Sequence, residues 1–311
     1  MMEISLQPNP DETPWIDAWI RWERDAMGTD DSDEDDDYQP ESPTHTFACR
    51  YAGTSQCPAI DISLRGFPSD SQETWNSTGL TLWRSSEHLC EYLVKEASSP
   101  RGLFAEHQRF LELGSGLGRS GILALHCLSI MTNNNIDDDS AGGEPRRKFL
   151  CLTDGDTDVL RQLRENVQQN QPCTNKSNND TKEEGNANHT TPTPIVTVNC
   201  SQLRWGYEST KAFLPSVDQQ PFDVIFGSDL IYVAKNIPPL FETVTTLLAP
   251  KQESLCTCSS SCFIMAHCTR REGNEVSVEM VLEAAESFGL EHSVVEEDDD
   301  ISLFVFRWKR N

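Results

Sequence analysis

Apolar and polar positions divide the chain into short strand-like runs and longer helix-like stretches. Five predominantly apolar runs of four or five residues are typical of strands buried on both faces; they are residues 110–113, 149–152, 195–198, 222–226 and 262–266. Apolar positions at helical spacing follow the first, second and fourth runs, at residues 119–130, 157–170 and 237–248. Strands that alternate with helices predict parallel βαβ units. We therefore expect an α/β fold with a doubly wound, Rossmann-like sheet and helices on both faces.

The C-terminal part predicts a different strand arrangement. Residues 277–288 have helical spacing, as do residues 85–94 near the start of the main domain. Residues 292–296 and 301–308 are strand-like stretches on either side of an acidic turn at 297–300. No crossover segment separates these last two strands, so they should pair as an antiparallel hairpin. The expected sheet is mostly parallel, with this hairpin at one edge.

A regular pattern of apolar strand-like and helix-like stretches begins near residue 73. We therefore predict an N-terminal segment (1–72) and a main domain (73–311). In the segment, Trp15, Trp19 and Trp22 have helical spacing, which indicates an amphipathic helix that docks on the main domain or binds a partner. Residues 30–37 are acidic except Ser32, and we expect them to be disordered. Alternatively, this acidic run attracts a basic substrate. Polar stretches at 132–147 and 171–193 predict surface loops inserted into the main domain.

Composition and charge narrow the possible partners. The 311 residues include 25 basic and 50 acidic side chains, a formal charge of −25. This charge argues against nucleic acid and favours a cationic partner, such as a protein surface that presents lysine. No run reaches the ~18–20 apolar residues of a membrane span, and residues 1–11 lack a secretory signal. We expect a cytoplasmic, or alternatively nuclear, monomer that does not bind membranes.

Eleven cysteines raise the questions of disulfides and metal binding. Without a secretory signal, reduced thiols in the core are the favoured interpretation. The most closely spaced group comprises Cys256, Cys258, Cys262 and Cys268. It lacks the paired C-x-x-C spacing of zinc sites, so we predict no metal.

A glycine-rich turn is the strongest local signal for ligand binding. The first predicted strand runs into Gly114, Gly116 and Gly118, and a predicted helix begins directly afterwards. Glycine allows a sharp turn and close approach to a ligand, and the N–H groups at a helix start can bind anions. The G-x-G-x-G spacing differs from the dinucleotide G-x-G-x-x-G pattern, and no G-K-[ST] follows to hold a triphosphate.

Acidic residues follow two further predicted strands. Asp154 ends the second strand, where a carboxylate can accept both ribose hydroxyls of a nucleoside. The alternative role for Asp154 is a helix N-cap, but Asp156 lies directly before the helix and fits that role better. Asp229 and Tyr232 follow the fourth strand and should lie near Asp154, at the edge of the sheet where the strands end. Alternatively, Asp229 only caps the following turn and Tyr232 only fills the core.

Five segments, in order along residues 75–308, together resemble a known family. They are Gly79-Leu-Thr-Leu-Trp83, Leu111-Glu-Leu-Gly-Ser-Gly-Leu-Gly118, Leu152-Thr-Asp154, Leu203-Arg-Trp-Gly206 and Ser228-Asp-Leu-Ile-Tyr232. The chain resembles the class I, seven-β-strand methyltransferases, and within them the protein-lysine methyltransferase-like group. Members of that group modify elongation factors, chaperones, valosin-containing protein and calmodulin. The resemblance implies S-adenosyl-L-methionine as the methyl donor.

The resemblance also implies a role for each matching residue. The implied donor-site residues are Trp83, Glu112, Gly114, Ser115, Gly116, Gly118, Asp154, Trp205 and Ser228. Among them, Glu112 and the turn 114–118 would hold the methionyl part, Asp154 the ribose and Trp205 the adenine, while Trp83 closes the site. Asp229 and Tyr232 would line the acceptor channel as the catalytic pair. The implied reaction is methyl transfer to a protein lysine; the alternatives are a small-molecule or other non-lysine acceptor, and a catalytically silent binding module.

Overall fold

The computed structural model describes a defined part of the chain. The described residues are 43, 45–54, 57–71, 77–134, 147–172, 196–250, 260–269, 276–298 and 300–310. The predicted helix around Trp15–Trp22 and the acidic run 30–37 lie outside these residues, as do Cys256, Cys258 and most of both polar insertions.

Seven strands form one sheet in the order β5-β4-β3-β6-β7-β9-β8. The strands are β3 (Arg109–Glu112), β4 (Lys148–Asp154), β5 (Val196–Gln202), β6 (Val224–Ser228), β7 (Cys262–Cys268), β8 (Leu290–Asp298) and β9 (Ile301–Trp308). Strands β3 to β7 pair in parallel, whereas β9 pairs antiparallel with both β7 and β8. The predicted doubly wound sheet with an antiparallel C-terminal edge hairpin is therefore confirmed.

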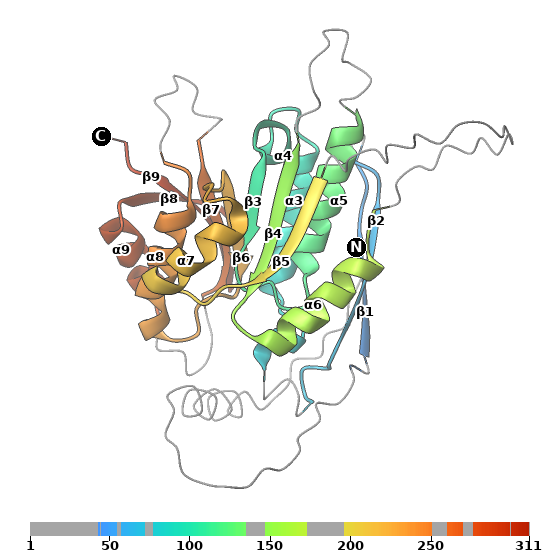
Figure 1. Cartoon of the computed structure of the whole chain (residues 1–311), viewed down its shortest axis with the longest axis horizontal. Coiled ribbons are helices and arrows are strands. Elements are labelled where there is room, and N and C mark those ends of the chain that lie inside the picture. Colours follow the sequence, from blue (N-terminus) through green and yellow to red (C-terminus); the bar gives the residue numbers. More distant parts are fainter. Residues whose placement is uncertain are drawn as a thin grey trace, which may run out of the picture.

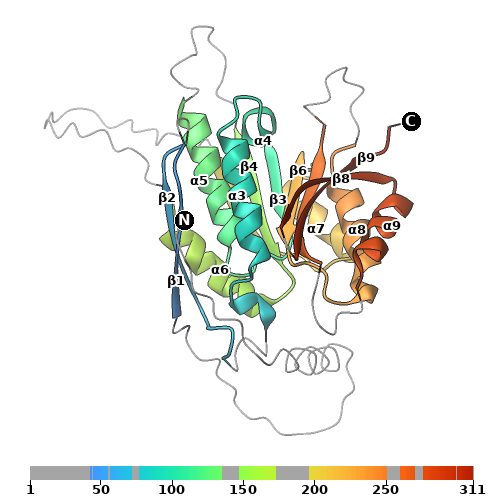
Figure 2. The same ribbon diagram turned by 180° about the vertical axis from the view of Figure 1, so that it is seen from behind.

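Helices cover both faces of this sheet, as predicted (Figures 1 and 2). The helices are α3 (Ser85–Ala97), α4 (Leu103–Glu106), α5 (Arg119–Asn134), α6 (Thr157–Gln169), α7 (Tyr207–Phe213), α8 (Ile237–Leu247) and α9 (Val278–Ser287), with short 3-10 turns at η1 (Thr78–Leu80), η3 (Leu214–Val217) and η4 (Ala234–Asn236). One hydrophobic core joins α3, α5 and α6 to the sheet, and a second joins α7, α8 and α9 to its other face. Because the central strands lie between two cores, nearly all their side chains are buried.

The order of the strands predicts a crevice at one end of the sheet. From β3 the chain moves outward to β4 and β5, and then returns to the other side of β3 through β6 and β7. Connections that leave a central strand in opposite directions open a crevice at the carboxyl ends of the strands, where ligands bind in such sheets. Glu112 and Ser228, which end β3 and β6, therefore lie at this switch point.

A second, two-stranded sheet lies outside the helices, and the sequence analysis made no prediction for it. Strands β1 (His45–Tyr51) and β2 (Ile60–Gly66) pair antiparallel and lie beside α5 and α6 (Figures 1 and 2). In β2, buried Ile60, Ile62 and Leu64 alternate with exposed residues. This period of two was readable from the sequence, but not which surface the apolar face would cover.

Other details confirm or correct the sequence analysis. Asp156 caps α6 by accepting hydrogen bonds from two backbone N–H groups, as predicted. The short helix α7 after β5 was not predicted. The cysteines in the described residues are free thiols, as expected; they are Cys49, Cys57, Cys90, Cys127, Cys151, Cys200, Cys262 and Cys268. Among the helices formed by the described residues, none has the length and apolar character needed to cross a membrane.

Candidate active site

The glycine-rich turn follows β3 directly, and its shape depends on glycine. Gly114, Gly116 and Gly118 have φ angles of 59°, 53° and 90°, in the left-handed region that other residues rarely adopt. Space is also short: a Cβ on Gly114 would lie 2.9 Å from Leu230, and one on Gly116 would lie 3.1 Å from the carbonyl oxygen of Gly79. Larger residues at these positions would therefore distort the turn.

The turn is attached to β4 by hydrogen bonds on both sides of Ser115. The Ser115 N–H donates to the Thr153 carbonyl (2.8 Å), and Ser115 Oγ accepts from the Thr153 N–H (3.1 Å). Thr153 Oγ1 in turn donates to the Glu112 carbonyl (2.6 Å). Because this threonine links the strand end to the turn, it is a site residue to which the sequence analysis gave no role. Its position within Leu152-Thr-Asp154 was the available signal.

Asp154 lies beside the turn, as its predicted role requires. Its Oδ2 accepts from the Gly116 N–H (3.1 Å) and its Oδ1 from the Asp156 N–H (3.1 Å). The side chain keeps some contact with solvent, but its surroundings withdraw the carboxyl from water and raise its pKa to about 6. The structure thus separates the two acids, because Asp156 caps the helix while Asp154 faces the turn.

Glu112, the last residue of β3, is a buried acid that faces the first turns of α5: a Cβ on Gly121 would lie 2.4 Å from its Oε2. Its side chain is 3% exposed, and its Oε2 has no hydrogen-bond partner among the described residues. Desolvation raises the pKa of this carboxyl to about 8, although hydrogen bonds from Ser115 and Ser120 oppose the shift. A carboxyl with one free, buried oxygen beside a glycine turn can accept a hydrogen bond from a positively charged ligand.

On the other side of the crevice, Asp229 follows β6 in an unusual conformation. It has φ of 50° although it is not glycine, and its side chain is 6% exposed. Its N–H donates to the Ala266 carbonyl on β7 (3.0 Å), which holds the backbone at this position. Ser228, the residue before it, ends β6 and pairs with the same Ala266. Strained residues of this kind cluster at functional sites.

Aromatic residues from separate parts of the chain meet around the crevice. The rings of Trp83 and Tyr232 pack edge to face with centroids 6.1 Å apart, and Trp83 Nε1–H donates to the Thr78 carbonyl (2.9 Å). Trp205 lies near the glycine turn, with its Cζ2 3.9 Å from where a Cβ of Gly114 would lie. The structure therefore brings Trp83 to Tyr232 and Trp205 to Gly114. Gly79 packs against Gly116, a contact that the sequence analysis did not predict.

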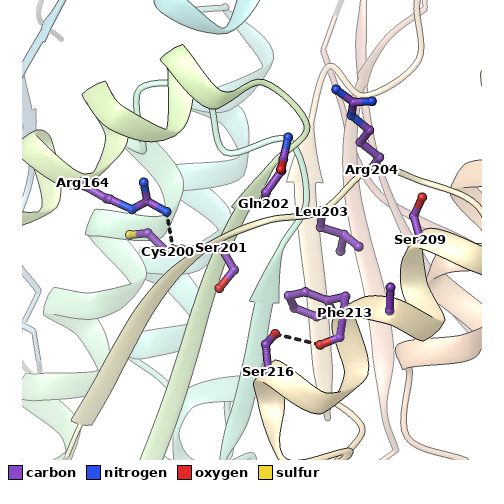
Figure 3. A pocket seen from close by; sticks show the side chains of 10 residues that line it. Arg164, Cys200, Ser201, Gln202, Leu203, Arg204, Ser209, Phe213 and Ser216 are labelled. Carbon is purple, nitrogen blue, oxygen red and sulfur yellow. Dashed lines mark hydrogen bonds between the residues drawn. The ribbon is translucent and has the colours of Figure 1, made fainter.

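A separate hollow of about 680 Å³ follows the outer edge of β5 (Figure 3). Figure 3 shows Arg164 and Arg204 on opposite sides of this hollow. The residues that line it are Arg164, Cys200, Ser201, Gln202, Leu203, Arg204, Ser209, Ala212, Phe213 and Ser216. Arg164 Nη2 donates to the Cys200 carbonyl (3.2 Å), which brings α6 to the strand edge. The lining includes none of the residues predicted for the donor or acceptor site, so this hollow is distinct from the crevice.

The strand order, the antiparallel last pair and the glycine turn after the central strand define the class I, S-adenosylmethionine-dependent methyltransferases. The model of the lysine methyltransferase family matches residues 69–283, and the chain belongs to this family. The methyl donor of the class is S-adenosyl-L-methionine. The residues present fit that donor, because Oε2 of the buried Glu112 has no hydrogen-bond partner among the described residues and the Asp154 carboxylate lies against the glycine turn.

Solved structures with a similar fold are distant in sequence. An O-methyltransferase family protein from Burkholderia thailandensis is 10% identical, with a TM-score of 0.40 over 72% of this chain and 58% of that one. The chain thus spans less than two thirds of that protein's length. A ribosomal protein L11 methylase from Lactobacillus delbrueckii subsp. bulgaricus is 13% identical, with a TM-score of 0.40 over 73% and 81% of the two chains. A methyltransferase from Bacteroides fragilis, solved with S-adenosyl-L-homocysteine, is 11% identical, with a TM-score of 0.35 over 85% and 86%. Among curated proteins, none matches the sequence significantly.

Proposed function

We propose that this protein transfers a methyl group from S-adenosyl-L-methionine to the side-chain amine of a protein lysine. The observation that carries the proposal is the junction of β3 and β4, where Asp154 accepts a hydrogen bond from the glycine turn and Glu112 keeps a free, buried oxygen. The family match supports lysine as the acceptor. The formal charge of −25 supports a cationic protein partner.

On the donor side, each group would have a defined task. Glu112 and the turn 114–118 would bind the methionyl part, Asp154 the ribose hydroxyls and Trp205 the adenine. Burial raises the pKa of both acids, and a nearby cation favours their ionised forms. The bound donor supplies an activated methyl group on a positively charged sulfur. Glu112 would therefore become ionised as it receives the positively charged methionyl end.

On the acceptor side, the task is to position a neutral amine. A free lysine has a pKa of about 10.4, so it is protonated at neutral pH and must lose its proton to water before it can attack. Desolvation beside the packed Trp83 and Tyr232 rings would lower the pKa of the lysine. Asp229 would orient the amine by accepting its hydrogen bonds. We assign it this orienting role because carboxylates ordinarily titrate far below amines and are weak bases toward them.

Calorimetric titration of the full-length protein with S-adenosyl-L-methionine tests the donor site. We expect Asp154→Ala to weaken binding about tenfold or more, since charge-assisted hydrogen bonds typically contribute about 1.5–3 kcal/mol. Asp156→Ala is the matched control, because it removes an acid two residues away that caps α6. It should cost about 1 kcal/mol of stability while leaving donor affinity within about twofold. An absence of binding by the wild type would contradict the proposal and favour a silent module.

Incubation of a cell lysate with isotope-labelled donor tests the acceptor. We expect label on a lysine of a protein, located by mass spectrometry of the labelled peptides. An Asp229→Asn variant serves as the inactive control in the same lysate. Label found only in metabolites or on non-lysine residues would overturn the assignment to lysine and leave the donor site unaffected.

A further inference from the structure

Two asparagine side chains, Asn166 in α6 and Asn170 at the C-cap of that helix, bind the backbone of β2 as a neighbouring strand would. Asn166 Oδ1 accepts from the Arg65 N–H (2.9 Å), and its Nδ2 donates to the Arg65 carbonyl (3.1 Å). Asn170 makes the same pair of bonds with Ser63, at 2.9 and 2.8 Å. Four residues of a helix rise about 6 Å, and two residues of a strand rise about 6.6 Å. Because these distances agree, consecutive asparagines on one helix face can bind alternate residues of one strand.

The two asparagines differ in what else they hold. Asn166 is fully buried, and its Nδ2 also donates to the Leu117 carbonyl (3.0 Å), between Gly116 and Gly118 in the glycine turn. Asn170 Nδ2 instead donates to the Asn166 carbonyl in the last turn of α6 (2.7 Å). Of the two, Asn166 is therefore the one whose side chain joins β2 to the glycine turn.

The end of β2 packs on the same turn from another direction. A Cβ on Gly66 would lie 2.4 Å from Leu117 Cδ1 and 2.8 Å from the Leu80 carbonyl oxygen. The Phe67 N–H donates to that Leu80 carbonyl (2.9 Å). Leu117 is 1% exposed. Leu117 of the turn is thus packed against β2 and lies close to η1 and α6.

The peptide plane explains why the Leu117 carbonyl matters. The Leu117 carbonyl and the Gly118 N–H belong to one planar peptide group, so fixing the direction of one fixes the other. This plane turns about the ψ angle of Leu117 and the φ angle of Gly118, and glycine permits a wide range of φ. The Gly118 N–H holds the plane from within the turn by donating to the Ser115 carbonyl (2.8 Å), and Asn166 holds its other end from outside the turn.

We propose that Asn166 is a positioning residue for the donor site, and that through it the β1–β2 hairpin supports the glycine turn from behind. This inference rests on the proposed function, in which the turn binds the methionyl part of the donor. It also extends the donor apparatus beyond the family match, because both strands precede residue 69. Asn166 acts through the turn and does not touch the donor.

The test compares Asn166→Ala with Asn170→Ala in the full-length protein. Each variant loses the two side-chain hydrogen bonds that hold one residue of β2. Only Asn166→Ala also removes the hydrogen bond to the Leu117 carbonyl. We expect donor affinity by calorimetry to fall about tenfold in Asn166→Ala and less than about twofold in Asn170→Ala. Hydrogen exchange of residues 113–120 without donor should be faster in Asn166→Ala alone.

A second variant approaches the same turn from the hairpin and leaves α6 intact. Gly66→Ala should press on Leu117 and weaken donor binding, and circular dichroism would check that it folds. Unchanged affinity in folded Asn166→Ala, or equal losses in both asparagine variants, would overturn the inference. If the wild type bound no donor, the proposed function would fail. The exchange measurement would still decide the role of Asn166, because it needs no donor; equal exchange in both variants would overturn it.

Discussion

The two sides of the crevice are built in different ways. At the ends of β3 and β4, hydrogen bonds that join main-chain groups to one another and to the side chains of Ser115, Thr153 and Asp154 hold the turn, and glycines occupy the left-handed conformations. After β6 the left-handed position is occupied by Asp229, which is not glycine. For residues other than glycine this conformation costs about 1–2 kcal/mol, less for aspartate, whose side chain can bond locally. The glycine turn after β3 therefore has little backbone strain. After β6 the backbone is strained at Asp229, and this conformation fixes the position of one particular carboxylate.

This difference suggests a division of labour. In the proposed function, the glycine turn and the two acids beside it would bind the parts of the methyl donor that are common to the whole class. On the other side, we propose that a carboxylate and two aromatic rings recognise the charge and shape of one acceptor. The comparison therefore predicts that substitutions on the two sides affect different measurements.

The largest expected effect is on the acceptor side. Asp229→Asn should lower methyl transfer about a thousandfold, because the amine loses the charged acceptor that orients it. Donor affinity should stay within about twofold. Asparagine tolerates the left-handed conformation, so the variant should fold. Transfer of labelled methyl groups and calorimetry on the same preparation would measure both quantities. A tenfold loss of donor affinity would show that the two sides are not separate.

On the donor side, Glu112→Gln should change how stability depends on pH. The pKa of Glu112 is about 8 in the folded protein and is ordinarily 4.5, so between these values the folded state binds more protons than the unfolded state. Wild-type stability from this group should fall as pH rises through that window, by about 1.4 kcal/mol per pH unit. The variant should lack this slope. Urea unfolding from pH 5 to pH 8 would measure it, and identical slopes would contradict the assignment.

Donor binding should also release protons at pH 7. Glu112 is mostly protonated in the free protein, and a positively charged ligand favours its ionised form. Calorimetry in buffers of different ionisation enthalpy would count the protons released. We expect about one proton or less for the wild type, and a smaller number for Glu112→Gln. Equal release by both proteins would assign the proton to another group.

The smallest expected effect concerns the aromatic pair. Tyr232→Leu removes the ring that packs on Trp83, a contact that typically contributes about 0.5–1.5 kcal/mol. Transfer should fall about fivefold through the KM for the acceptor. Tyr232→Phe keeps the ring and is the matched control, with a change of less than about twofold. Steady-state kinetics on the labelled substrate would test this pair; a larger effect of Tyr232→Phe would assign a role to the hydroxyl.

The sequence predicted the features that depend on neighbouring residues. Alternation of apolar runs predicted the strands of the main sheet and most of its helices, and residue order correctly predicted that Asp156 caps α6. The glycine spacing indicated a ligand turn, which the left-handed φ angles now explain. In each case the cause is local, because backbone conformation and helix caps depend on a few consecutive side chains.

By itself, then, the sequence determined the class of fold, the turn and the order in which acids follow the strands. Only the tertiary structure decided that Glu112 is buried with a free oxygen and that Trp83 meets Tyr232. It likewise decided that Asn166 binds a strand 101 residues earlier in the chain. In the sequence, a pair of asparagines at i and i+4 looks the same whether the helix face that carries it is exposed or buried. What distinguishes them is the element packed against the helix, and that depends on the folding of the whole chain.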